Sequence, residues 1–174
     1  MAISYRNLDN ITRELMISEL ELDGRDGIYI SSYLNESGRE EIYDLMSESF
    51  LSGTDDTLSR SIITRNLLNS YTTRRNRNGT TTQARVPFTA ATTLAEGQFN
   101  LYYMRALSIR ALSENRRIIV YRGKDVENPR AESQMLIGEN LDPNHVLTVL
   151  RETLGVNPSI GIPLPNSGLS LQLI

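Results

Sequence analysis

The stretch TLAEGQFNLYYMRALSIRALSE, residues 93–114, decides the fold of this chain. Apolar side chains between Phe99 and Leu112 surround nearly the whole circumference of a helix with about 3.6 residues per turn. A helix of that kind is buried on all sides, so we predict that this one forms the centre of the core. Thr93 and Glu96 have the spacing of a capping box, which predicts that the helix begins there.

The remaining sequence predicts further helices and short strands around this centre. Helical spacing and capping signals predict helices at residues 9–22, 37–51, 54–68 and 142–155, and β-forming residues predict strands at 28–30, 117–121 and 169–173. The helix starts rest on Ser37 with Glu40, on Thr54, and on Asp142 followed by Pro143. We therefore predict an α+β fold: a mostly helical single domain, residues 1–174, around one buried central helix, with a small sheet and extended arms.

An arginine-rich segment interrupts this pattern at residues 72–87. It begins TTRRNRNGTTTQAR, contains Arg74, Arg75, Arg77 and Arg85, and has no acidic residue. Because so polar a segment cannot bury itself, we predict a mobile loop or arm. Three interpretations stay open: the arginines bind a polyanion such as nucleic acid, they meet a protein partner or another copy, or the segment is an inert solvated loop.

The charged residues form opposed blocks along the chain. Residues 1–56 contain four arginines and thirteen acids, a net charge of −9, whereas residues 57–130 contain thirteen basic residues and four acids, a net charge of +9. The whole chain carries −3. We expect the acidic part to dock on the basic part, within one chain or between copies, or the basic surface to meet phosphate.

The residue types argue against most catalytic chemistry. Cysteine is absent, and His145 is the only histidine, expected on a helix surface, so thiol catalysis and histidine-rich metal sites are excluded. The glycines and lysine of a phosphate-binding loop are also missing. A carboxylate-dependent nuclease would need an acid and a lysine on the strand itself, whereas Lys124, Asp125 and Glu127 follow it. We expect no enzymatic activity and no cofactor.

Polar residues within the central helix allow two interpretations. Tyr103 and Arg105 share that helix with Glu96, and such a cluster could bind a ligand. A buried arginine tied to a carboxylate for structural reasons is the commoner outcome.

Nothing in the sequence predicts a membrane partner. No stretch approaches the roughly 18 apolar residues of a membrane span, and residues 1–10 lack the apolar run of a signal peptide. We expect a cytoplasmic or virion location.

The C-terminal segment, residues 156–174, is predicted to be an extended tail. Leu169, Leu171 and Leu173 alternate with Ser170 and Gln172, as in a half-buried strand. Several prolines precede that strand, so we expect it to separate easily from the body and to extend the sheet of a neighbouring copy as an assembly tail.

Three stretches resemble segments of uncharacterised small proteins of bacterial and phage genomes. They are LAEGQFNLYYMRAL at residues 94–107, VYRGKDVENPR at 120–130 and PNSGLSLQL at 165–173. The resemblance implies a bacterial or viral source, and it brings no activity and no catalytic residue.

Together these features predict a non-enzymatic structural protein that self-associates in a larger particle such as a phage virion. The opposed charge blocks, the polar arm and the strand-like tail motivate that prediction. One alternative is a nucleic-acid-binding protein that uses the arginine-rich segment. A carboxylate-dependent enzyme is the weaker alternative.

Overall fold

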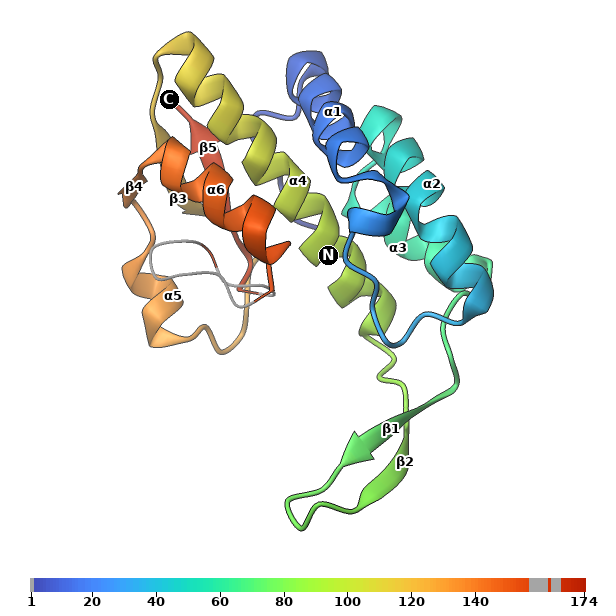
Figure 1. Ribbon diagram of the computed structural model, residues 1–174. Coiled ribbons are helices and arrows are strands. Elements are labelled where there is room, and N and C mark those ends of the chain that lie inside the picture. The colour runs from blue at the N-terminus through green and yellow to red at the C-terminus, as the bar shows by residue number, and fades with distance from the viewer. Residues whose placement is uncertain (1, 157–162, 164–166) are drawn as a thin grey trace.

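The computed structural model describes residues 2–156, 163 and 167–174 and has an α+β fold around one central helix (Figure 1). This helix, α4, spans Ala90–Glu114 and contacts α1 (Asn10–Gly27), α3 (Asp55–Thr64) and α6 (Pro143–Thr153). Its side chains are buried around almost the full circumference, as the apolar pattern predicts. The predicted fold class and central helix are confirmed.

Aromatic rings fill the space where α4 meets the N-terminal elements. Phe50 of α2 (Glu36–Ser52) packs against Phe99 and Tyr102 of α4, with ring centroids 5.4 and 5.2 Å apart. Tyr5 lies against Phe99 and Tyr103 at 4.9 and 4.8 Å. These tilted and edge-on arrangements are the favourable ones for aromatic pairs, so the rings fix the N-terminal segment on α4.

Two of the predicted helix starts are confirmed. The Asp142 side chain accepts a hydrogen bond from the Asn144 N–H, and Pro143 occupies the first position of α6. Thr54 precedes α3, and its N–H donates to Thr57 Oγ1. The helix ends earlier than predicted, at Thr64, because Asn66 adopts the left-handed conformation with φ of 55°.

The other two capping predictions are wrong. Helix α2 is capped by Asn35, whose side chain accepts from the Gly38 N–H at 2.8 Å, instead of by Ser37. Helix α4 begins at Ala90, and Glu96 forms an ion pair with Lys124 instead of capping the helix. A capping-box pattern can occur within a helix when an earlier residue supplies the cap.

A three-stranded antiparallel sheet packs beside α4 in the order β4-β3-β5. Strand β3 (Ile118–Arg122) lies in the middle, β4 (Asn140–Leu141) is short, and β5 (Leu169–Leu173) pairs with β3 along its whole length. The predicted strand at residues 28–30 is wrong. These residues lie between α1 and α2, where Ile28 enters the core without a neighbouring strand.

The predicted assembly tail is also wrong, because β5 completes the sheet of its own chain. Leu169, Leu171 and Leu173 are all buried, and Ser170 between them is buried as well. Asn100 of α4 donates to the Leu169 carbonyl at 2.9 Å and accepts from the Ser170 hydroxyl at 2.6 Å. The expected separation depended on Pro163 and Pro165; Pro163 is buried, and Pro165 lies outside the described residues.

Candidate interaction site

A two-stranded hairpin projects from the body between α3 and α4 (Figure 1). Strands β1 (Tyr71–Arg75) and β2 (Thr81–Arg85) pair antiparallel over five residue pairs, from Tyr71 opposite Arg85 to Arg75 opposite Thr81. Of the predicted loop or arm, the arginine-rich segment is thus an arm, built as a regular hairpin.

Local chemistry at the tip explains why this polar segment forms a hairpin. The Gly79 N–H donates to the Asn76 carbonyl, and the Asn76 N–H donates to the Thr80 carbonyl at 2.8 Å. Gly79 has φ of 84°, a conformation that glycine adopts without a steric cost. Asn78 and Gly79 form the Asn-Gly signal of tight hairpins, and threonines, which favour strands, flank it. That signal could have predicted the hairpin from sequence.

The arginines are distributed unequally between the two faces of the hairpin. Side chains alternate along a strand, and cross-strand partners share a face. Arg75 and Arg85 therefore share one face with Tyr71 and Gln83, whereas Arg74 lies on the opposite face. Arg77 lies in the turn. We call the face with Tyr71, Arg75, Gln83 and Arg85 the tyrosine face.

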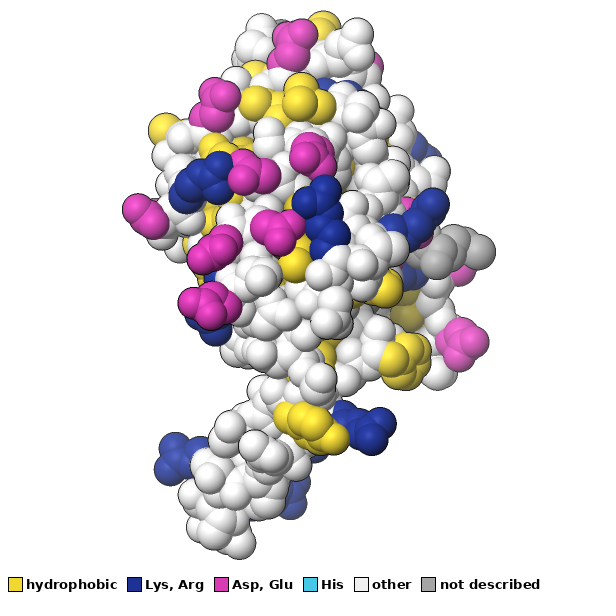
Figure 2. Space-filling view, turned by 90° about the vertical axis from the view of Figure 1, so that its right-hand side faces the viewer, with side chains coloured by type: hydrophobic (Ala, Val, Ile, Leu, Met, Phe, Trp, Pro, Cys, Tyr) yellow, Lys and Arg dark blue, Asp and Glu magenta, His cyan; other side chains and the backbone are white. Residues whose placement is uncertain are grey.

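The four arm arginines are exposed and unpaired. Among the described residues, no side chain forms an ion pair or hydrogen bond with the guanidinium groups of Arg74, Arg75, Arg77 or Arg85. Since the chain carries −3 in total and the arm carries four positive charges, the remainder of the chain carries −7. Figure 2 shows basic side chains on the projecting hairpin and acidic ones gathered on the body above it.

Exposed aromatic side chains lie at the foot of the arm. Phe88, between β2 and α4, is 97% exposed, and Tyr71 at the start of β1 is 52% exposed. Figure 2 shows a hydrophobic patch where the hairpin joins the body. Arginine next to exposed aromatic rings is the composition typical of recognition surfaces.

Elsewhere, the opposed charge blocks meet within the chain. The Arg105 guanidinium is fully buried and lies 2.7 Å from Glu19 and 2.6 Å from Asp23, both in α1. Arg151 of α6 binds the other oxygen of Glu19 at 2.5 Å. Burial acts to raise the pKa of Glu19, but the Arg151 hydrogen bond and the charges of Arg105 and Arg151 outweigh it and lower that pKa.

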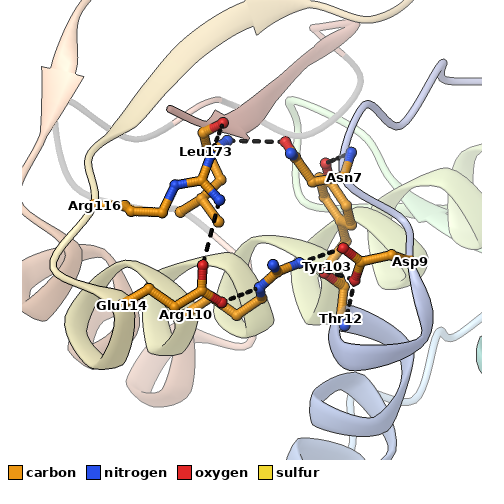
Figure 3. A network of polar contacts seen from close by, with 8 residues as sticks. All are labelled: Asn7, Asp9, Thr12, Tyr103, Arg110, Glu114, Arg116 and Leu173. Atoms are coloured by element: carbon orange, nitrogen blue, oxygen red, sulfur yellow. Dashed lines mark hydrogen bonds and ion pairs between the residues drawn. The ribbon is translucent and has the colours of Figure 1, made fainter.

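A second network ties α1 to the end of α4 (Figure 3). Arg110 lies 2.8 Å from Asp9, which also caps α1 by accepting from the Thr12 N–H. Glu114 binds Arg110 at 2.7 Å and also pairs with Arg116. Burial acts to raise the pKa of Asp9, but the Thr12 N–H and Arg110 outweigh it and lower that pKa.

The same network holds the N-terminal segment against β5 (Figure 3). The Asn7 N–H donates to the Tyr103 hydroxyl at 3.1 Å, and the Asn7 side-chain oxygen accepts from the Leu173 N–H at 2.9 Å. Arg116 donates to the Leu173 carbonyl at 3.2 Å. These arginines and Tyr103 are thus committed to structural contacts.

The residues considered for catalysis are not brought together. Lys124 pairs with Glu96, whereas Asp125 and Glu127 are exposed, and so is His145 in the first turn of α6. Across residues 2–156, 163 and 167–174, no group of three or more His, Cys, Asp or Glu side chains could hold a metal ion. Over the same ranges, no helix is both long and apolar enough to cross a membrane.

Comparisons with known proteins leave the arm as the main guide to function. The chain matches no protein-family model, no curated protein and no solved structure.

Proposed function

We propose that this protein is a non-enzymatic assembly protein whose hairpin arm docks on an acidic surface of a neighbouring copy in a larger particle. The observation that carries this proposal is the projecting arm, with four exposed arginines that have no acidic partner among the described residues. The resemblance to uncharacterised small proteins of bacterial and phage genomes motivates a virion as that particle.

Charge complementarity supports another copy as the partner. The arm is the basic part of a chain whose remainder carries −7, so one copy offers both the cation and the anion surface. A single exposed ion pair contributes only about 0 to 1 kcal/mol. Several arginines on one regular hairpin can act together, and arginine binds carboxylates in a planar, two-pronged geometry.

The tyrosine face supports a second candidate function, nucleic-acid binding. A two-stranded β-ribbon fits the major groove, which is about 12 Å wide, and arginines contact phosphates and guanine edges. Tyr71 beside Arg85 could stack on a base, and Gln83 could bind a base edge. The net negative charge of the rest of the chain favours the protein partner over this candidate.

Sedimentation at about 0.05 M and about 1 M salt tests the proposal, because exposed charge pairs are screened at high ionic strength. We expect the chain to assemble at low salt and the triple variant R74A/R75A/R77A to assemble less. The matched control R25A/R60A/R130A removes three exposed charges from the body and leaves the arm intact. A chain that stays monomeric at high concentration and low salt would overturn the proposal.

Fluorescence anisotropy with a labelled DNA duplex tests the second candidate. Binding that weakens with salt, and that the arm variant loses while the control keeps it, would favour nucleic acid.

A further inference from the structure

Phe88 is an exposed aromatic side chain that does not pack into the core of its own chain. It immediately precedes Thr89, the cap of α4, and is 97% exposed. Single exposed aromatic residues at the foot of a projecting element are typical anchors of protein interfaces, where they fill a pocket on the partner.

A pocket of about 300 Å³ lies along the first half of α4. Its walls come from α4, the connection between α1 and α2, the end of α6, Ile3 and the segment that leads into β5, and include Leu94, Gly97, Leu101, Leu150 and Pro163. The volume is at the lower end of the range for binding pockets. It therefore suits a large side chain with part of its backbone.

Two features of this pocket have no explanation in the packing of the chain itself. Gly97 lies inside α4, where glycine is unfavourable, yet a Cβ there would meet nothing within 4 Å. Gln98 is 5% exposed and also lines the pocket, and its side-chain oxygen has no hydrogen-bond partner among the described residues. The pocket thus has open space beside Gly97 and an acceptor without a donor.

The charge of the arm favours a second copy as the source of the occupant. The remainder of the chain carries −7, so a second copy offers an acidic body to the arm of the first. Arg85, one of the unpaired arm arginines, lies three residues before Phe88 in the chain.

We propose that Phe88 of one copy occupies this pocket in a second copy, with the arm arginines on the acidic body of that copy. A backbone N–H of the entering segment would supply the donor that Gln98 lacks. This inference rests on the proposed self-association and names its contact surface.

Two variants remove opposite halves of the contact. Phe88→Ala deletes the anchor, and Gly97→Leu fills the pocket from within, with Gly97→Ala as a milder version. Met135→Ala is the matched control, because Met135 is also highly exposed, at 78%, but lies in α5 (Ala131–Met135). We expect F88A and G97L each to weaken self-association by roughly tenfold or more, and M135A to leave it unchanged. Thermal unfolding checks that each variant is folded.

Mixing the two variants distinguishes a contact from a general loss of structure. F88A keeps an intact pocket and G97L keeps an intact Phe88, so their equimolar mixture should form pairs that neither forms alone. A mixture as monomeric as its components would overturn the inference. If F88A and G97L assemble as the unmodified chain does while R74A/R75A/R77A does not, the inference fails and the proposed function stands. If the unmodified chain never assembles, both fail.

Discussion

Replacing Arg105 by methionine tests whether the buried charge network holds α1 on α4. The Arg105 guanidinium is fully buried and donates to Glu19 at 2.8 Å and to Asp23 at 2.6 and 3.0 Å. Methionine preserves much of the apolar stem but removes all of these bonds. Removing one partner of a buried ion pair costs about 3 to 5 kcal/mol, because the other charge is left uncompensated.

The remaining contacts place the expected loss at the lower end of that range. Glu19 keeps Arg151, which binds it at 2.9 and 2.5 Å. Asp23 keeps only the Tyr102 hydroxyl at 2.7 Å among the described residues, but its side chain is 11% exposed, so water can reach it. We therefore expect the free energy of unfolding at pH 7 to fall by about 3 kcal/mol.

The loss should depend on pH in a defined direction. Because the pKa of Glu19 is lowered in the fold, its ionised form stabilises the protein above the unfolded-state value of about 4.3, and this contribution is lost as the pH falls further. In R105M, protonation of Glu19 in acid removes part of the uncompensated negative charge. The difference in free energy of unfolding between the unmodified chain and R105M should therefore become smaller towards pH 3.

Urea unfolding at pH 7 and near pH 3 measures both effects. Arg25→Met is the control, because the pair Arg25 and Asp44 is more than half exposed and should contribute little. The reasoning would be refuted if the free energy of unfolding of R105M at pH 7 were within about 1 kcal/mol of that of the unmodified chain, or if the difference in free energy between them grew in acid.

Three further predictions concern other parts of the fold. Gly38→Ala should lower the free energy of unfolding by about 1 to 3 kcal/mol, because the new Cβ would lie 2.4 Å from the Leu67 carbonyl oxygen. Gly97→Ala should raise the free energy of unfolding by about 0.5 to 1 kcal/mol, because a Cβ there meets nothing within 4 Å and alanine favours the helix. Urea unfolding of both variants measures the two effects. Leu171→Ala should cost about 2 to 5 kcal/mol, and a chain cut after Asn166 should lose cooperative thermal unfolding; a truncated chain that unfolds as before would show that β5 is dispensable. Burial raises the pKa of Asp55, so ionisation of this carboxyl lowers the free energy of unfolding as the pH rises above about 4. Asp55→Asn should remove this decrease between pH 3 and 7. A free energy of unfolding that varies with pH as in the unmodified chain would contradict the prediction.

The candidate site was only partly predictable from sequence. The absence of acids between residues 72 and 87 identified Arg74, Arg75, Arg77 and Arg85, and the structure brings all four together on one hairpin. Their division between two faces depends on strand register, which was not predicted. Phe88 was missed, because an apolar residue next to a helix start is usually buried, and its exposure is visible only in the folded chain.

Local signals predicted the parts of the fold whose causes are local. Helix α4 follows from an apolar pattern that must be buried all round, and α6 follows from Asp142 and Pro143, which act on the backbone beside them. At Ser37, the competing cap Asn35 decided the start of the helix, whereas α4 begins before Thr93, after Thr89, which forms no side-chain cap hydrogen bond.

By itself, the sequence determined that a fully buried helix would form the centre and that an unburied arginine segment would lie outside it, because both depend on which side chains can leave water. Only the tertiary structure decided that β5 pairs with its own β3 and that Arg105 meets Glu19, which is 86 residues away in the chain. The alternation of Leu169, Leu171 and Leu173 predicts that one face of this strand is buried. It does not determine whether the same chain or a neighbouring copy covers that face. That choice depends on the free edge of β3 and the apolar surface of α4, which lie together only after the helices have packed.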